Sequence, residues 1–367
     1  MRITSVTTWS TRGVTLVEIR TDTGEFGWGQ TAPFNADITA TVLHRMVAPV
    51  AMRLDDPDPA TLADRVVAAN LKFPGSFMLR ALCGVETALW DLLGRRENKL
   101  VCELLGATPG PWPAYASSMR RDISPADEAK RILALRDASG FRACKVRVGD
   151  GEGEDRDRWP GRSEELIDTM RSSFGPDFVI HADANSAYRP ARAIEIGRRL
   201  HGGGPGHFEE PCPYWQMEWT REVTQALDGD VSGGEQDNWM PVWERMVRDH
   251  VVDIAQPDVC YIGGISRAMQ VAALAREAGM PCTPHSANVS MVTVFTLHLM
   301  RAIANPGPFL ELSIEEPGEL GELYEPRLEV RDGELLMPNN EPGWGVRPRA
   351  EWLEAANRVT SARTETV

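Results

Sequence analysis

The stretch FVIHADANSAYRPARAIEIGRRLHGGGPGHFEEP, residues 178–211, contains the two patterns that decide the fold. Its ends, FVIHADAN (178–185) and HFEEP (207–211), are short apolar runs that finish in acidic or amide residues. The part between them, RPARAIEIGRRLHGG, has apolar residues at helical spacing. A strand, a helix and a second strand in this order form the repeating unit of a parallel α/β fold.

The same alternation extends in both directions from this stretch. Amphipathic segments such as SPADEAKRILALRDASG and SRAMQVAALAREAGM separate further apolar runs. Strand-like runs, each followed by a helix-like segment, predict a (β/α)₈ TIM-type barrel over residues 113–317. The eight runs are WPAYASS, ACKVRVG, FVIHADAN, HFEEP, VSGGEQ, VDIAQPD, PCTPHSAN and PFLELS.

Residues 1–112 follow a different pattern. RITSVTTW (2–9) and GVTLVEIR (13–20) are typical of strands, and TDTGEFGWGQ adds a hairpin and a third strand. The segment from about residue 36 is helical and includes SFMLRALCGVETALWDLLGRRENKLVCELLGA, which stops at Gly106. A small sheet followed by helices predicts a separate α+β domain. In residues 318–367, EVRDGELLMPNNEPGWG indicates a final hairpin and an extended tail.

Composition and charge disfavour several classes of protein. The 367-residue chain is 42% hydrophobic and 25% charged, which is ordinary for a globular protein, and it has no apolar run long enough to cross a membrane. The formal net charge of −14 disfavours nucleic-acid and anionic-membrane partners. We expect a cytoplasmic protein, because MRITSVTTWSTRG lacks the apolar core of a signal peptide and the six cysteines show no CxxC spacing.

Polar residues end most of the strand-like runs, where barrel enzymes place their chemistry. They follow one another at intervals of 23 to 27 residues, one strand–helix unit each: Asp183, Glu209, Glu235, Asp258, His285 and Glu311. We therefore expect them to surround one mouth of the barrel. The carboxylates of Asp183, Glu209 and Glu235 would repel one another unless a cation lay between them. Oxygen ligands favour Mg²⁺ over Mn²⁺ or Ca²⁺.

These motifs together resemble the enolase superfamily, in its mandelate racemase subgroup, over nearly the whole chain. The resemblance implies a modified (β/α)₈ barrel with an α+β capping domain, which residues 1–112 form and residues 318–367 return to. It also implies one Mg²⁺ per subunit and removal of a proton α to a carboxylate. The matching motifs are GEFGWGQ, VETALWDLLG, Lys145-Val-Arg147, Asp183-Ala-Asn185, Glu209-Glu210-Pro211, Gly234-Glu235, the Asp258 and His285 pair, and Glu311.

The chemistry implied by the resemblance assigns roles to these residues. Removing the α-proton creates an enediolate with two negative charges, which a divalent cation and nearby positive groups stabilise. His285 is the expected acid/base, with Asp258 holding one ring nitrogen. Glu311 matches a family carboxylate that hydrogen-bonds the enediolate in its protonated form. Residues expected to support the metal or touch the substrate are Asn185, Glu210, Tyr115, Ser117 and Ser118. We expect His181 to be structural, one layer deeper than Asp183, and find no functional case for His44, His201, His207, His250 or His298.

The second run departs from the racemases of this subgroup, in which it ends in Lys-x-Lys and the second lysine is a base. Here the pair is Lys145 and Arg147, and residues two apart on a strand face the same way. Arginine stays protonated at any ordinary pH, so we expect Arg147 to bind a carboxylate rather than to accept a proton. Beside a guanidinium the pKa of Lys145 should fall, which keeps Lys145 open as a second base.

With one good base, we expect β-elimination of water from a sugar acid to give a 2-keto-3-deoxy acid, the reaction of a carbon–oxygen lyase. The alternatives within the family are a racemase or epimerase of a 2-hydroxy acid and a sugar-acid lactone cycloisomerase. A non-catalytic binding protein is a further alternative, and a zinc hydrolase would need more histidines at the strand ends.

We expect the substrate to be a small anion and the protein to be a homo-oligomer. Two loops are relevant to substrate binding. The Gly-rich, charged insert GDGEGEDRDRWPGR, residues 149–162, is expected to act as a substrate lid above the barrel mouth. The loop near Ser10–Gly13 is short, although in the family this loop closes over the substrate.

Overall fold

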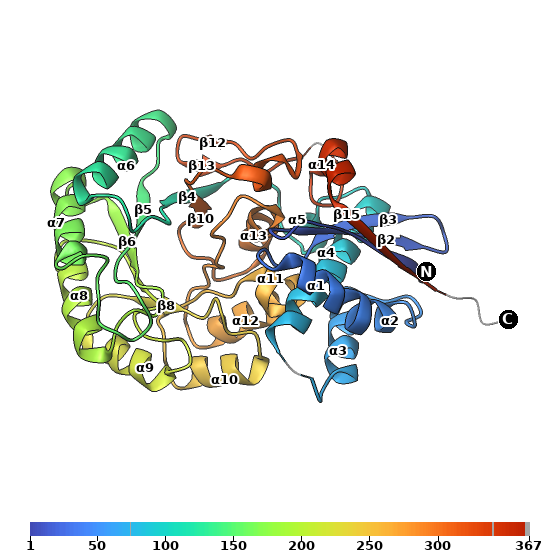
Figure 1. The fold of residues 1–367 in the computed structure, drawn as a ribbon, viewed down its shortest axis with the longest axis horizontal. Helices are drawn as coiled ribbons and strands as arrows, with labels where there is room; N and C mark the ends of the chain where they lie inside the picture. The colour runs from blue at the N-terminus through green and yellow to red at the C-terminus, as the bar shows by residue number, and fades with distance from the viewer. Residues whose placement is uncertain (74, 340, 364–367) are drawn as a thin grey trace.

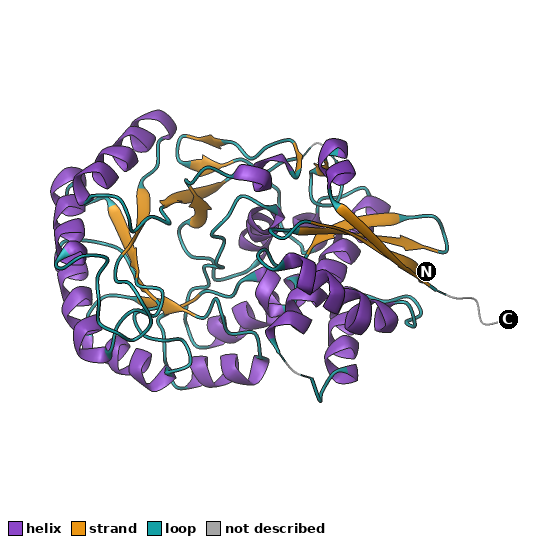
Figure 2. Cartoon of the chain, in the orientation of Figure 1, coloured by secondary structure: helices purple, strands orange, loops and turns teal. Residues whose placement is uncertain are grey.

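The structure is a computed structural model that describes residues 1–73, 75–339 and 341–363, and it has two parts (Figure 1). One part is a ring of strands with helices outside it, and the other is a layer of helices beside a small sheet (Figure 2). The predicted fold class, a (β/α) barrel with an α+β capping domain, is confirmed by this arrangement.

The capping part contains an antiparallel sheet in the order β15-β1-β2-β3. Its strands are β1 (Ile3–Ser10), β2 (Thr15–Thr21), β3 (Phe26–Gln30) and β15 (Asn357–Ala362). The chain returns at its C-terminal end to supply β15, which pairs with β1 so that Val6 lies opposite Ser361. Figure 1 shows this red strand beside the blue ones. The helices are α1 (Ala36–Val42), the π-helical turn η1 (Leu43–Val47), α2 (Ala48–Ala51), α3 (Pro59–Ala69), α4 (Ser76–Glu97) and α5 (Val101–Leu104).

Helix α4 packs tightly against β3 because β3 presents glycines to it. A Cβ on Gly27 would lie 2.1 Å from the Ala88 carbonyl oxygen, and one on Gly29 would lie 2.4 Å from that of Gly84. The predicted helical stretch to Gly106 is interrupted at Asn98, whose left-handed φ of 52° ends α4 before α5 begins. The close approach makes α4 the link between the sheet and the barrel, since it also contacts α11.

The barrel is a parallel ring. Its strands are β4 (Trp112–Ser117), β5 (Ala143–Arg147), β6 (Val179–Asp183), β7 (Phe208–Glu209), β8 (Val231–Gly233), β9 (Ile254–Ala255) and β10 (Leu310–Ser313), and β10 closes the ring against β4. Around the outside lie α6 (Pro125–Ser139), α7 (Arg162–Phe174), α8 (Pro190–Gly202), α9 (Met217–Ala226), α10 (Met240–Arg248), α11 (Val259–Ile262), α12 (Ile265–Glu277) and α13 (Met291–Ala302).

The seventh predicted strand, PCTPHSAN, forms only isolated bridges. Cys282 pairs with Ala255 on one side and Pro306 on the other, and His285 pairs with Asp258. Pro281 and Pro284 have no N–H to donate, so a regular ladder cannot extend through this run. The run still occupies its place in the ring, and this places His285 beside Asp258.

The last segment contacts both parts. After β10 the chain forms the short 3₁₀ helix η2 (Gly318–Glu322) rather than an α-helix, and the predicted hairpin β12 (Val330–Arg331) and β13 (Glu334–Leu335) pairs with β4. Strands β11 (Tyr324–Glu325) and β14 (Arg347–Pro348) pair with each other, and α14 (Ala350–Ala355) leads into β15. One buried cluster lies within the capping part, and a larger one fills the barrel and extends to capping residues such as Leu16 and Cys83. The boundaries after residues 112 and 317 stay predictions.

Residues 149–162 form an anchored loop. The backbone N–H groups of Gly153 and Asp155 donate to the carbonyls of Ser186 and Ala187, at 2.8 and 3.2 Å. The Asp157 carboxylate accepts from the Tyr188 hydroxyl at 3.1 Å. These bonds hold the insert against the loop after β6, so the predicted substrate lid finds no support in this arrangement.

Two further predictions concern partners and compartment. All six cysteines are buried and unpaired. No helix within the described ranges combines the length and the apolarity needed to cross a membrane. The cytoplasmic setting and the homo-oligomer stay predictions.

Candidate active site

Lys145, on β5, lies at the centre of the barrel mouth. It is completely buried, and its Nζ is 2.6 Å from Glu311 Oε1, 2.7 Å from Glu209 Oε1 and 3.4 Å from Asp183 Oδ2. Burial alone would lower the pKa of Lys145, but these carboxylates outweigh it and raise the pKa well above its ordinary value. The prediction that its pKa falls is therefore wrong, because three carboxylates lie within 3.4 Å of the ammonium.

Arg147 ends the same strand and pairs with Asp183, a predicted metal ligand. Its Nη1 contacts Asp183 Oδ2 and lies 2.5 Å from Asn185 Oδ1. The backbone N–H of Asn185 donates to Asp183 Oδ1 at 2.7 Å, and Arg121 Nη2 donates to Asn185 Oδ1 at 3.0 Å. Asn185 therefore contacts Asp183, and its role in supporting the metal stays a prediction.

The Asp258 and His285 side chains form a hydrogen-bonded dyad. Asp258 Oδ2 lies 2.7 Å from His285 Nδ1, while its Oδ1 accepts from the N–H groups of Cys260 and Tyr261 at 2.7 and 3.0 Å. With Nδ1 held, Nε2 faces the mouth, 3.0 Å from Glu235 Oε2. Burial alone would lower the pKa of His285, but Glu235, Glu311 and Asp258 together raise it to about 10.

Glu311, on β10, is held by several donors. Ser117 Oγ donates to its Oε1 at 2.7 Å, the Ser286 N–H donates to its Oε2 at 2.9 Å, and Lys145 pairs with it. Burial would raise the pKa of this carboxyl, but Lys145 and His285 lower it to about 2. Without a bound enediolate, Lys145 favours the ionised form of Glu311. That Glu311 is protonated when it hydrogen-bonds the enediolate stays a prediction.

The predicted metal ligands lie on neighbouring strands in buried positions. Asp183 on β6 is in register with Glu209 on β7, and Glu235 follows β8. In the described part of the chain no three such side chains converge as a ready-made metal cluster, since Lys145 and Arg147 contact two of them and His285 the third. The donor chemistry still fits a hard divalent cation, because all three are buried carboxylates at the ends of neighbouring strands.

Glu210 and Ser118 differ in where they point. Glu210 is buried beside the mouth with its Oε1 unpartnered within the described chain, and burial together with the nearby carboxylates raises its pKa well above the ordinary value. This placement fits the predicted role near the metal ligands. Ser118 points away from the mouth, and its Oγ accepts from Arg131 on α6 at 2.6 Å. Neighbouring residues on a strand face opposite sides, so Ser117 lies in the site and Ser118 does not.

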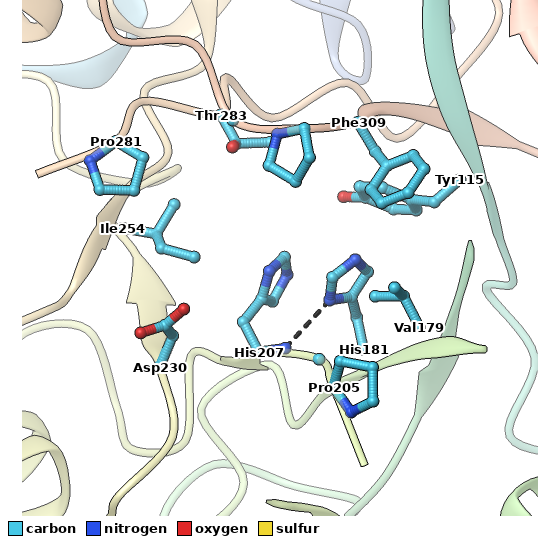
Figure 3. Close-up of a pocket in the computed structure, with 13 residues that line it drawn as sticks. Tyr115, Val179, His181, Pro205, His207, Asp230, Ile254, Pro281, Thr283 and Phe309 are labelled. Carbon is cyan, nitrogen blue, oxygen red and sulfur yellow. Dashed lines mark hydrogen bonds between the residues drawn. The ribbon is translucent and has the colours of Figure 1, made fainter. Parts of the chain in front are cut away.

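Tyr115 lies below the mouth, where it lines a cavity of about 240 Å³ (Figure 3). Its ring packs against His181 at a centroid distance of 4.9 Å, and His181 stacks on His207 at 3.7 Å. The cavity opens among the N-terminal ends of the strands, at the end opposite the carboxylates, with Val179 and Ile254 in its lining. The predicted contact of Tyr115 with substrate therefore finds no support, whereas His181 lies one layer deeper, as expected.

Two glutamines also donate to predicted metal ligands, and neither was predicted from the sequence. Gln256 Nε2 donates to Glu209 Oε2 at 3.0 Å, and Gln236 Nε2 donates to Glu235 Oε1 at 2.9 Å. Gln256 precedes Asp258 by two residues, so strand periodicity could have placed it on the inner face. Gln236 directly follows a predicted ligand, and no pattern in the sequence distinguishes it from an ordinary loop residue.

Comparisons with known proteins agree with this architecture and site. Residues 2–106 match the mandelate racemase/muconate lactonizing enzyme N-terminal domain, and residues 127–352 match the enolase C-terminal domain-like family. Among curated relatives, D-galactarolactone cycloisomerase from Agrobacterium fabrum is 31% identical over 91% of this chain and 89% of its own length. Arabinonate dehydratase from Saccharolobus solfataricus is 27% identical over 92% and 88%.

Solved structures are similar over the whole chain. A Roseobacter denitrificans protein provisionally called a racemase is 49% identical with a TM-score of 0.96, covering 99% of this chain and all of that one. A mandelate racemase/muconate lactonizing protein from Paracoccus denitrificans, complexed with magnesium, is 27% identical with a TM-score of 0.89 and covers 98% of each chain. This chain is therefore an enzyme of the enolase superfamily, in its mandelate racemase subgroup.

Proposed function

We propose that this enzyme removes the proton α to the carboxylate of a sugar acid and eliminates water to give a 2-keto-3-deoxy acid. The observation that carries the proposal is the Asp258–His285 dyad, whose Nε2 faces the mouth beside Glu235. Sugar-acid dehydration and lactone isomerisation are also the activities for which the curated relatives are named.

The residues that would hold Mg²⁺ are Asp183, Glu209 and Glu235, with Glu210 and Gln256 beside them. When bound, the metal would supply positive charge against the substrate carboxylate as negative charge develops there. Arg147 and Lys145, which contact Asp183 and Glu209, are the cations of β5 that would bind the substrate carboxylate beside the metal. Two such cations suit a small anionic substrate.

The chain's own groups account for the proton transfers. His285 Nε2 takes the α-proton while Asp258 holds Nδ1 and stabilises the imidazolium that forms. The same proton then passes to the β-hydroxyl, which leaves as water while the C–O bond breaks and an enol remains. The enol tautomerises to the 2-keto acid. Glu311 keeps Lys145 in place through its 2.6 Å contact and is oriented by Ser117.

One base on one face favours elimination over racemisation, which needs a second base on the opposite face. There, Lys145 is enclosed by three carboxylates and Arg147 is paired with Asp183. A racemase or epimerase is the second candidate, favoured by the 49% identical relative that is provisionally called a racemase. A lactone cycloisomerase is the third, favoured by the relative from Agrobacterium fabrum.

A panel of sugar mono- and diacids, incubated with the enzyme and Mg²⁺ in deuterated water, separates these activities. We expect one or more acids to lose water and form a 2-keto-3-deoxy product, detected as a keto acid and by its mass. Interconversion of C2 epimers with deuterium uptake and no loss of water would make the enzyme an epimerase. A lactone that changes its ring without loss of water would make it a cycloisomerase.

A further inference from the structure

Arg80, on the capping helix α4, reaches across to the barrel mouth. Its guanidinium carbon lies 3.4 Å from the centroid of the Tyr261 ring, and Nη2 donates to Gln236 Oε1 at 3.3 Å. Its Nε donates to Ser76 Oγ at 2.6 Å, which anchors the side chain to the first turn of α4. Arg80 therefore connects the capping part to the loop after β8 and to the short helix α11 after β9.

Both barrel partners of Arg80 touch predicted functional groups. Gln236 donates to Glu235 Oε1 at 2.9 Å, and the Tyr261 N–H donates to Asp258 Oδ1 at 3.0 Å. The Tyr261 ring also lies 6.0 Å from the His285 ring, centroid to centroid. Arg80 thus contacts two residues, of which one donates to a predicted metal ligand and the other to the dyad.

The chemistry of the guanidinium decides how Gln236 is oriented. Arginine has only donors, so the side-chain amide of Gln236 must turn its carbonyl oxygen toward Arg80. The amide NH₂ then donates to the Glu235 carboxylate at 2.9 Å. Without Arg80, either orientation of the amide would be open, and the reversed one would place an oxygen against the carboxylate.

We infer that Arg80 is a positioning residue through which the capping helix holds Glu235 in its metal-binding orientation. This inference rests on the proposed function in one respect, namely that Glu235 is a metal ligand. The stack on Tyr261 fixes the plane of the guanidinium, and lysine could supply the charge but neither the plane nor the fork of donors. The capping domain therefore takes part in metal binding without contributing a ligand.

A double-mutant cycle on the metal-free protein tests this, with Mn²⁺ as the probe and electron paramagnetic resonance of the free ion as the readout. We expect Arg80→Met and Gln236→Met each to weaken Mn²⁺ binding by about tenfold, the range found when groups that orient metal ligands are removed. Because both act through one chain of contacts, the double variant should bind no more weakly than either single variant. The exposed Arg65→Met on α3 is the matched control and should bind like the unmodified protein.

The outcomes separate the inference from the proposed function. Unchanged Mn²⁺ affinity in Arg80→Met, or losses that add in the double variant, would overturn the inference alone. An unmodified protein that binds no Mn²⁺ would overturn the metal assignment as well. Gln236→Met keeps the stack of Arg80 on Tyr261, so it tests the relay even if Arg80→Met does not fold.

Discussion

The inside of the barrel has two layers that differ in charge although they lie on the same strands. The upper layer, at the mouth, contains Ser117, Asp183 and Glu209, and the lower layer contains Tyr115, His181 and His207. Each upper residue follows a lower one by two positions, and both face inward. The step between them is about 7 Å along a strand.

The side chains of the two layers differ in their charge and in their contacts. The upper layer is ionic, with Lys145 between carboxylates at 2.6 to 3.4 Å. In the lower layer, burial lowers the pKa of His181 well below its ordinary value, and its Nδ1 accepts from the His207 N–H at 3.0 Å. Figure 3 shows Tyr115, His181 and His207 around the cavity at that end. Alternation in a sequence identifies the inner face, whereas depth decides whether a group meets substrate.

The largest effect should come from the upper layer, at the dyad. His285→Asn removes the imidazole nitrogen that faces the mouth beside Glu235, and we expect turnover to fall by about a thousandfold or more, because an asparagine amide cannot accept the α-proton. Loss of water from the best substrate of the sugar-acid panel is the measurement.

A surface histidine serves as the control for that variant. His250 is exposed and has a left-handed φ of 48°, which asparagine tolerates well, so His250→Asn should keep full activity. If His285→Asn kept more than about a tenth of the activity, the base would lie elsewhere and Lys145 would be the first residue to examine.

A smaller but still large effect should follow from a change at a predicted metal ligand. Glu235→Gln removes the negative charge and keeps the shape, and we expect Mg²⁺ affinity to fall by about a hundredfold, with activity partly restored at high Mg²⁺. Calorimetric titration of the metal-free protein measures the affinity, and circular dichroism checks that the fold is intact.

The exposed Glu244→Gln on α10 is the matched control for this substitution and should change neither quantity. Removal of Mg²⁺ by a chelator should abolish activity in the unmodified enzyme. Full activity of Glu235→Gln after exhaustive chelation would show that the enzyme needs no metal at this position.

The spacing of the chain was enough to predict the ring and its mouth, because the units from Asp183 to Glu311 have nearly the same length and the strand of each ends in a polar residue. What spacing could not show is the state of the groups. The pKa of Lys145 was predicted to fall beside Arg147, yet carboxylates contributed by three other strands raise it. Likewise, Pro281 and Pro284 remove the donors of the seventh strand, and the insert 149–162 is held by backbone bonds that composition does not reveal.

The smallest effect, and the sharpest test of the two layers, is expected at Tyr115. Its hydroxyl is buried and has no partner among the described residues, so Tyr115→Phe removes a polar group without breaking a hydrogen bond. We expect activity within about twofold of the unmodified enzyme and a stability gain of up to about 1 kcal/mol in denaturant unfolding. Tyr324→Phe is the matched control, because that tyrosine is also buried but its hydroxyl donates to the Val289 carbonyl at 2.9 Å. Loss of this hydroxyl should lower the free energy of unfolding by about 1 kcal/mol.

Changes of opposite sign in the free energy of unfolding of the two variants would show that the lower layer leaves the Tyr115 hydroxyl unsatisfied. Unchanged activity of Tyr115→Phe would show that this hydroxyl plays no part in the chemistry at the mouth. A loss of stability equal to that of Tyr324→Phe would mean that the cavity supplies a partner. A tenfold loss of activity would instead indicate that Tyr115 contacts the substrate, as its position near the end of the first strand predicts.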